Sequence, residues 1–100
     1  MELSYTKLTA EQIAQQITTT NGWQVNEGAL TKTFSFENYA NGVLFGNAVA
    51  HIADDLNHHP DLLIGYGKVT VSMVTHDADG GLTAFDFELA RRIDQIPLKG

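Results

Sequence analysis

The sequence has 100 residues, 43% of them hydrophobic, which suits a single folded domain spanning residues 1–100. It contains no cysteine, and its formal net charge is −6 with only six scattered Lys and Arg, so disulfides and thiolate metal sites are excluded and direct nucleic-acid binding is disfavoured. The first residues lack a signal-peptide pattern and no segment is apolar over the length of a bilayer, so we expect a cytoplasmic protein without membrane contact.

The first half of the chain predicts a helix followed by a strand pair. Residues 9–18 form the helix, because Thr9 and Gln12 match a capping box and two isoleucines four residues apart share one face. Residues 23–25 and 30–36 form the strands, because the second segment alternates between large side chains and Thr or Ser. We expect one face of this hairpin to be buried.

The second half repeats this order with a longer helix. Residues 37–57 carry an apolar stripe at steps of three and four, and Gly42 and Gly46 within it are expected to allow close packing onto the sheet. A short apolar run and the alternating segment 66–75 form a second strand pair, and residues 83–96 form the last helix. The order predicts an α+β fold (α-β-β-α-β-β-α), an antiparallel four-stranded sheet with three helices packed on one face.

Three of the four histidines stand at predicted element ends, where side chains are held by the scaffold and can face a cleft. His58 and His59 follow the long helix, and His76 follows the last strand. An imidazole has an ordinary pKa of about 6.5, so it can give or take a proton near neutral pH. The pattern therefore predicts one acid–base site built from these three histidines, whereas His51 has no such context.

Carboxylates lie near these histidines in the sequence. Asp54 and His58 are four residues apart on the helix, so they share a face, and this spacing predicts that Asp54 orients the His58 ring. Asp77 and Asp86 could orient His76 or contact a substrate. Simpler roles compete with these, because a histidine at a helix end can be a cap or a dipole partner, and Asp86 also matches the capping box of the last helix.

A zinc site built from the three histidines and an aspartate is the sharpest chemical alternative. The spacing argues against it, because the adjacent His58 and His59 do not normally point at one centre, and helical ligand pairs usually stand four residues apart. We therefore expect no metal site.

Taken in order along the chain, these residues resemble the pterin-4a-carbinolamine dehydratases. The resemblance rests on short motifs whose order and spacing match across nearly the whole chain. They are Gly22-Trp23, Phe34-x-Phe36, His58-His59-Pro60, Tyr66, Thr75-His76-Asp77, and Gly80-Gly81-Leu82-Thr83 with Asp86. A lone His-His-Pro would be weak, but the ordered set is specific.

The resemblance implies a dehydration that needs no metal or organic cofactor. Family members remove water from 4a-hydroxytetrahydropterin, the product that an aromatic amino acid hydroxylase leaves, and form quinonoid dihydropterin. The active-site histidines of the family correspond to His58, His59 and His76. We assign the first and last as the acid–base pair, in an order that the sequence does not fix, and His59 as a binding donor. Asp54, where the family commonly has Glu, and Asp86 correspond to residues that orient these groups or contact the pterin.

The resemblance also implies a homodimer or homotetramer. The chain departs from the family at Leu62, where Trp is frequent, and in the loop at 77–81, which is one residue longer than the common form. Some relatives bind a transcription factor or act as assembly factors, so a non-catalytic binding, assembly or coactivator module on the same scaffold is the second hypothesis. The histidine set favours the enzyme, because a pure binding module has no need of it.

Overall fold

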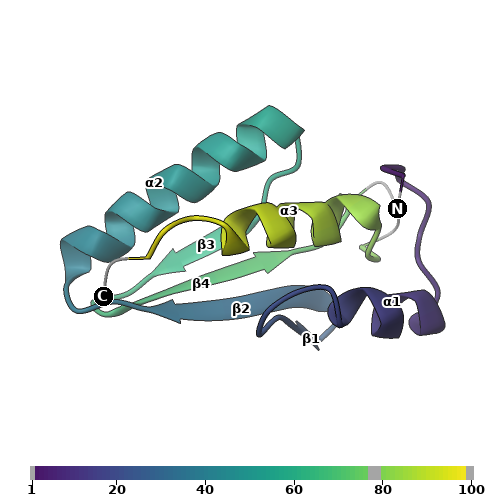
Figure 1. The fold of residues 1–100 in the computed structure, drawn as a ribbon, viewed down its shortest axis with the longest axis horizontal. Helices are drawn as coiled ribbons and strands as arrows, with labels where there is room; N and C mark the ends of the chain where they lie inside the picture. The colour runs from purple at the N-terminus through teal and green to yellow at the C-terminus, as the bar shows by residue number, and fades with distance from the viewer. Residues whose placement is uncertain (1, 77–79, 99–100) are drawn as a thin grey trace.

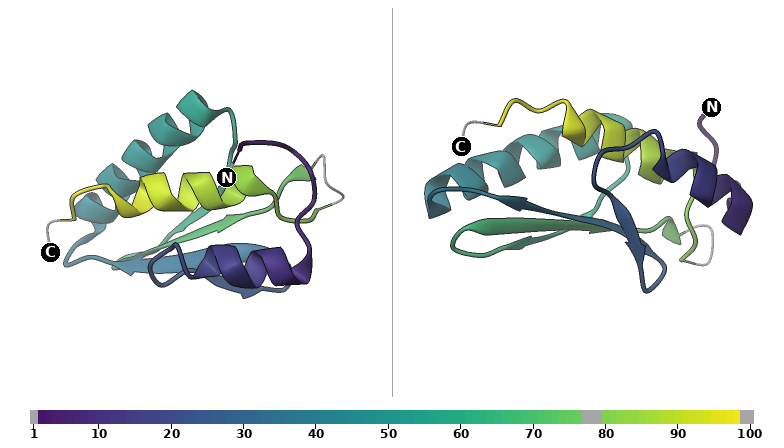
Figure 2. Two further views of the ribbon diagram at one scale, coloured as in Figure 1. Left: turned by 45° about the vertical axis from the view of Figure 1, so that its right-hand side comes forward. Right: turned by 60° about the horizontal axis from the view of Figure 1, so that its bottom comes forward.

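The computed structural model describes residues 2–76 and 80–98. Its elements are α1 (Ala10–Ile17), β1 (Gln24–Asn26), β2 (Ala29–Ser35), α2 (Tyr39–Leu56), β3 (Asp61–Ile64), β4 (Lys68–Met73) and α3 (Ala84–Asp94). The strands form one antiparallel sheet in the order β1-β2-β4-β3. Helices α2 and α3 lie over one face of this sheet, and α1 lies on the same side (Figure 1, Figure 2). The predicted α+β fold is confirmed.

The core fills the space between the sheet and the helices. In β2, Leu30 and Phe34 point inward and are buried, and in β4 the same holds for Val69, Val71 and Met73. Side chains two residues apart in a strand share a face, so these inward rows follow directly from the alternation in the sequence. Within the described ranges, none of the helices is both long and apolar enough to cross a membrane.

Polar contacts fix α1 and the turn before β1 against α3. The guanidinium of Arg91 donates to Gln16 Oε1 at 3.3 Å and to Thr19 Oγ1 at 2.9 Å. Asp94, at the end of α3, accepts from Trp23 Nε1 at 2.9 Å and lies 2.8 Å from the ammonium of Lys32. The one charged residue in the inward row of β2 is therefore paired where it enters the core.

Some observed elements are shorter than predicted. Helix α2 begins at Tyr39 rather than at residue 37, because Asn38 caps it and accepts the N–H of Asn41 at 2.9 Å. Strand β4 ends at Met73, because Thr75 pairs only with Gly81, in an isolated bridge. This early exit from the sheet frees the residues after β4 to turn toward the end of α2.

Two glycines let α2 lie close to the sheet. Gly42 and Gly46 are buried, and a Cβ atom on them would lie 3.3 Å from Val69 Cγ2 and 3.1 Å from Ile64 Cδ1 respectively. The predicted close packing is confirmed. It explains why the helix keeps two residues that each disfavour helical backbone by about 1 kcal/mol relative to alanine.

We predict that Gly46→Val lowers the free energy of unfolding by about 1–3 kcal/mol, because the new methyl groups overpack the contact with Ile64. Urea unfolding followed by circular dichroism measures this. Asn47→Val is the matched control, because it places the same side chain on an exposed position of α2, where the change should stay within about 0.5 kcal/mol. Equal stability of the two variants would contradict the close approach of helix and sheet.

Candidate active site

The three predicted histidines line one pocket. Its volume is about 290 Å³, and its lining comes from three parts of the chain. These are the segment before α1, the exit of α2 and the exit of β4, which contribute Tyr5, Asn57, His58, His59, Val74, Thr75 and His76. The distant segments meet because α2 packs along β3 and β4, so its last turn lies near the end of β4.

A left-handed residue directly precedes the two adjacent histidines. Asn57 has φ 54° and ψ 43°, a conformation that asparagine adopts more readily than most residues. Its N–H still donates to Asp54 O at 3.1 Å, and the next N–H donates to Ala53 O at 3.0 Å, so the last helical carbonyls are satisfied. After this turn His58 is buried and His59 is exposed. The left-handed residue thus ends the helix just before the doublet, and the two imidazoles after it lie in different environments.

Asp86 is the buried partner of His58. Its side chain is fully buried, and its Oδ1 atom lies 2.6 Å from His58 Nε2. Its Oδ2 atom accepts the N–H of Thr83 at 2.9 Å and the hydroxyl of Thr75 at 2.7 Å. The capping box expected for Asp86 is present, and the histidine that it contacts is His58 rather than His76. A buried carboxylate persists only when it is paired and hydrogen-bonded in this way.

The hydrogen bonds of Thr75 and Thr83 form a chain of donors that leads to the Asp86 carboxylate. Because Thr75 gives its hydroxyl hydrogen to the carboxylate, the 2.8 Å contact between the two threonine hydroxyls must be donated by Thr83. The Thr83 hydroxyl in turn accepts the N–H of Phe85 at 3.2 Å. Both threonines are buried, so the chain of donors ends on one carboxylate that is shielded from water.

The predicted pairing of Asp54 with His58 is wrong. Asp54 Oδ1 lies 3.0 Å from His59 Nε2, and the two side chains are 73% and 58% exposed. The reason is the left-handed turn at Asn57, which takes the following residues off the helix, so the four-residue spacing no longer places two side chains on one face. An exposed pair of this kind contributes about 0–1 kcal/mol.

The remaining predicted residues lie as follows. His76 is exposed and lines the pocket one residue after the Thr75–Gly81 bridge. Asp77 and most of the loop at 77–81 lie outside the described residues, so the predicted contact between Asp77 and His76 stays a prediction. His51 is exposed on α2. Across residues 2–76 and 80–98, no group of three or more His, Asp or Glu side chains is arranged to hold a metal ion.

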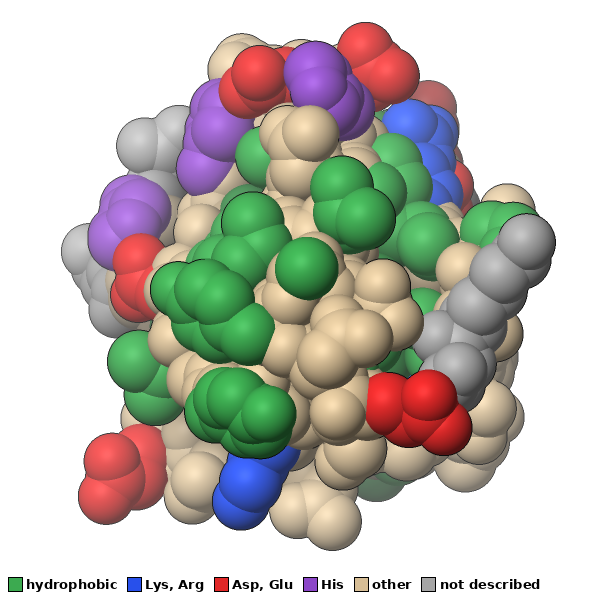
Figure 3. Space-filling view, turned by 90° about the vertical axis from the view of Figure 1, so that its left-hand side faces the viewer, with side chains coloured by type: hydrophobic (Ala, Val, Ile, Leu, Met, Phe, Trp, Pro, Cys, Tyr) green, Lys and Arg blue, Asp and Glu red, His purple; other side chains and the backbone are tan. Residues whose placement is uncertain are grey.

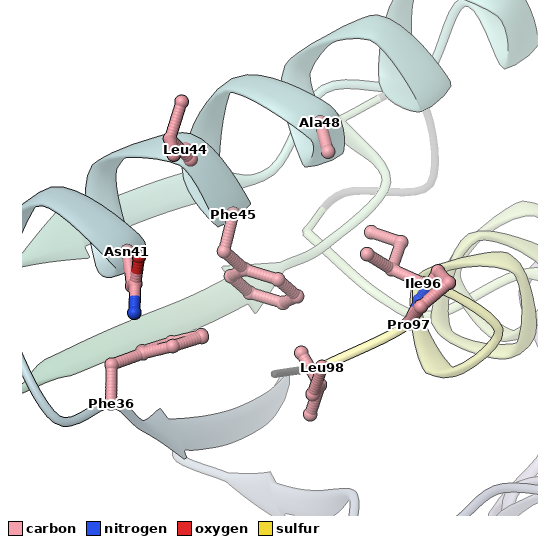
Figure 4. Close-up of a pocket in the computed structure, with 8 residues that line it drawn as sticks. All are labelled: Phe36, Asn41, Leu44, Phe45, Ala48, Ile96, Pro97 and Leu98. Atoms are coloured by element: carbon pink, nitrogen blue, oxygen red, sulfur yellow. The ribbon is translucent and has the colours of Figure 1, made fainter. Parts of the chain in front are cut away.

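A second hollow, of about 300 Å³, separates α2 from the segment after α3 (Figure 4). Its lining consists of Phe36, Asn41, Leu44, Phe45, Ala48, Ile96, Pro97 and Leu98. Apart from the amide of Asn41, these side chains are apolar, and the described lining holds no imidazole or carboxylate. Proton transfer needs such groups, so the histidine pocket is the candidate active site.

The histidine pocket offers imidazoles in two different settings. A carboxylate only accepts hydrogen bonds, so Nε2 of His58 carries the hydrogen and Nδ1 is the nitrogen that remains for a ligand. The buried contact with Asp86 fixes the orientation of this ring. His59 and His76 are exposed and line the same pocket. A site of this kind can accept one proton and donate another.

A family model described as pterin 4 alpha carbinolamine dehydratase matches residues 6–96. The chain belongs to this family. A relative from Sulfurisphaera tokodaii, provisionally named a pterin-4-alpha-carbinolamine dehydratase, is 44% identical over 90 residues, which cover 90% of this chain and 96% of the relative. A relative of the same provisional name from Rhizobium meliloti is 44% identical over 91 residues, with 89% and 86% covered.

Solved structures agree with this family membership. The crystal structure of a transcriptional coactivator/pterin dehydratase from Brucella melitensis matches with a TM-score of 0.82 at 28% identity, covering 89% of this chain and 96% of that one. A pterin dehydratase-like protein described as a RuBisCO assembly factor in the alpha-carboxysome matches with a TM-score of 0.57 at 23% identity, covering 72% and 82%. The second likeness concerns the fold alone.

Sequence analysis of this dehydratase-family chain missed several lining residues. It gave no role in the site to Tyr5 or Asn57, and it assigned the partner of His58 incorrectly. Thr75 stood in the family motif, but its bond to Asp86 depends on two segments meeting in space. The Asn57-His58 order was a usable signal, because asparagine after an amphipathic helix often marks a left-handed end.

We predict that Asp86→Asn inverts the tautomer of His58. The amide oxygen can still accept from Thr75 and Thr83, but the amide NH₂ would donate to His58 Nε2 and move the ring hydrogen to Nδ1. We expect a folded protein that is less stable by about 1–3 kcal/mol. Nitrogen-15 NMR of the imidazoles measures the tautomer, and urea unfolding measures the stability.

Asp54→Asn is the control for this experiment, because it changes the exposed pair with His59 and should leave the His58 tautomer and the stability unchanged. An unaltered His58 tautomer in Asp86→Asn would show that the carboxylate does not orient this ring.

Proposed function

We propose that this protein dehydrates a 4a-hydroxytetrahydropterin to quinonoid dihydropterin, using its histidines as general acid and base and no cofactor. The observation that carries the proposal is the convergence of three imidazoles on one pocket, one of them oriented by a buried carboxylate. Membership of the pterin dehydratase family supports the substrate class. A role in recycling the pterin used by an aromatic amino acid hydroxylase is part of this proposal.

The reaction requires two proton transfers on neighbouring atoms. The C4a–O bond breaks, and the hydroxyl leaves as water after it gains a proton. N5 loses its proton, and the electron pair of the N5–H bond forms the C4a=N5 double bond. One proton enters and one leaves, so a protonated imidazole and a neutral imidazole together supply what the step needs.

We assign the two proton transfers to His58 and His76, and substrate binding to His59. His58 is held rigidly by Asp86, which suits a group that must meet a reacting atom in a defined geometry. His76 reaches the same pocket from the end of β4. The buried Asp86 acts as the orienting group of His58. The exposed Asp54 orients His59 in the same way, but more weakly.

We predict that His76→Ala lowers kcat/KM about 10²–10⁴-fold, the usual contribution of a general acid or base. Because this side chain is exposed, the free energy of unfolding should change by no more than about 0.5 kcal/mol. Stopped-flow absorbance with freshly generated 4a-hydroxytetrahydropterin measures the rate, and urea unfolding measures the stability. His51→Ala, an exposed histidine of α2, is the matched control and should keep normal turnover.

Two results would count against the proposal. Normal turnover by His76→Ala would remove this residue from the mechanism. A folded wild-type protein that fails to accelerate dehydration would overturn the enzyme assignment and would favour a binding, assembly or coactivator role on the same scaffold.

We also propose that the protein is a homodimer or homotetramer, as the family resemblance implies. Strand β3 is an edge of the sheet, and large apolar side chains are exposed on it, on the turn after it and on the first half of α2. They are Tyr39, Val43, Leu44, Leu63 and Tyr66. Figure 3 shows apolar side chains gathered on this end of the molecule. Exposed patches of this kind and unpaired strand edges favour association.

We predict that light scattering gives a mass of two or four times 10.9 kDa. Leu44→Asp or Leu63→Asp should reduce this mass, because a charge would have to be buried in the contact. Val25→Asp, at an exposed position of the opposite edge strand β1, should leave it unchanged. A wild-type mass equal to one chain at micromolar concentration would refute the oligomer.

A further inference from the structure

We propose that Tyr5 is a substrate-binding residue of the active site, whose ring forms the aromatic wall against which the flat substrate lies. This inference rests on the proposed pterin substrate and adds a residue to its site. Tyr5 belongs to the segment before α1, it lines the histidine pocket, and it precedes the first residue that the family model matches. Tyr5 is therefore not one of the residues that carry the family resemblance.

The segment that carries Tyr5 is attached to the body of the protein at two points. The N–H of Leu8 donates to Leu82 O at 2.8 Å, and the Leu8 side chain is buried. The Tyr5 ring stacks on the ring of Phe85, with centroids 4.4 Å apart and planes inclined by 17°. The position of Tyr5 beside the pocket is thus fixed by a backbone hydrogen bond and by aromatic packing.

Phe85 links Tyr5 to the histidine that Asp86 orients. Phe85 lies in the first turn of α3, directly before Asp86, and its ring centroid is 5.9 Å from that of His58. Phe85 thus packs near both rings, and of the three only Tyr5 and His58 line the pocket. One side chain, Phe85, therefore contacts both the proposed aromatic wall and the proposed proton-transfer group.

The exposure of Tyr5 favours a role in binding a ligand over a role in anchoring the segment alone. Tyr5 is 45% exposed although its ring is packed on Phe85, whereas Leu8, which anchors the same segment, is 9% exposed. Of the described lining residues, the others are polar or imidazole groups except Val74. Tyr5 thus supplies the large aromatic surface in a polar pocket, and a flat conjugated ring gains binding energy from such a surface.

The position of this wall has a consequence for the reaction. A fused ring that lies flat on Tyr5 keeps this contact while C4a and N5 react, so the contact stabilises the substrate and the transition state alike. Tyr5 itself holds no proton that the step requires. Its contribution is to substrate binding, so its loss should raise KM more than it lowers kcat.

The test uses the full chain and four substitutions. We expect Tyr5→Ala to raise KM for 4a-hydroxytetrahydropterin about tenfold, with kcat changed by less than about threefold, because stacking on an aromatic side chain is typically worth a factor of this size. Tyr5→Phe keeps the ring and should keep the wild-type KM. Tyr5→Leu retains apolar contact with Phe85 but lacks a planar face, so its KM should rise as well. Leu3→Ala, an exposed residue of the same segment, is the control and should change nothing.

A direct binding measurement accompanies the kinetics. Fluorescence titration with 7,8-dihydropterin, which cannot undergo the dehydration, should give about a tenfold weaker Kd for Tyr5→Ala and Tyr5→Leu and an unchanged Kd for Tyr5→Phe and Leu3→Ala. Thermal melting of each variant checks the fold. If Tyr5→Ala loses stability, Tyr5→Leu decides the question, because it preserves the packing on Phe85.

The outcomes separate this inference from the proposed function. An active wild type whose KM and Kd are unaffected by Tyr5→Ala and Tyr5→Leu overturns the role of Tyr5 alone. A fall in kcat with unchanged Kd also overturns it, because that pattern indicates a structural effect on the histidines. A wild type that neither binds dihydropterin nor accelerates dehydration overturns the proposed function and this inference with it.

Discussion

The fold and the candidate site both depend on one buried carboxylate. Asp86 lies at the start of α3 with no exposed surface, and a charge in that position costs several kcal/mol unless donors surround it. The donors come from three places: Thr83 before α3, Thr75 after β4, and His58 after α2. Satisfying this single group therefore brings three element ends together, and two of them, the exits of α2 and β4, line the pocket.

The alternation in the strands and the stripe along α2 were sufficient to predict the architecture, because burial of one face determines both patterns. Leu30, Phe34, Val69 and Val71 occupy the core for this reason alone. The close approach at Gly46 was also predictable, because glycine in an otherwise strong helix calls for a packing explanation. These features follow from residues that are near one another in the sequence or that repeat at a fixed period.

The partners within the site could not be predicted in the same way. Spacing placed Asp54 beside His58, but one left-handed residue, Asn57, cancels helical spacing for everything that follows it. The contact of His58 with Asp86 spans 28 residues, and the stack of Tyr5 on Phe85 joins the two ends of the chain. The order of motifs identified which residues converge, whereas the hydrogen-bond partners depended on contacts between segments that are distant in the sequence.

The two histidines that follow Asn57 also differ in how far salt in the solution can affect their ion pairs. Dissolved ions reach the exposed pair of His59 and Asp54 and weaken an attraction that water has already reduced. They do not reach the contact between His58 and Asp86, because both side chains are buried. Ionic strength therefore acts on one member of the doublet and leaves the geometry of its neighbour intact, so two residues joined by a single peptide bond belong to different electrostatic environments.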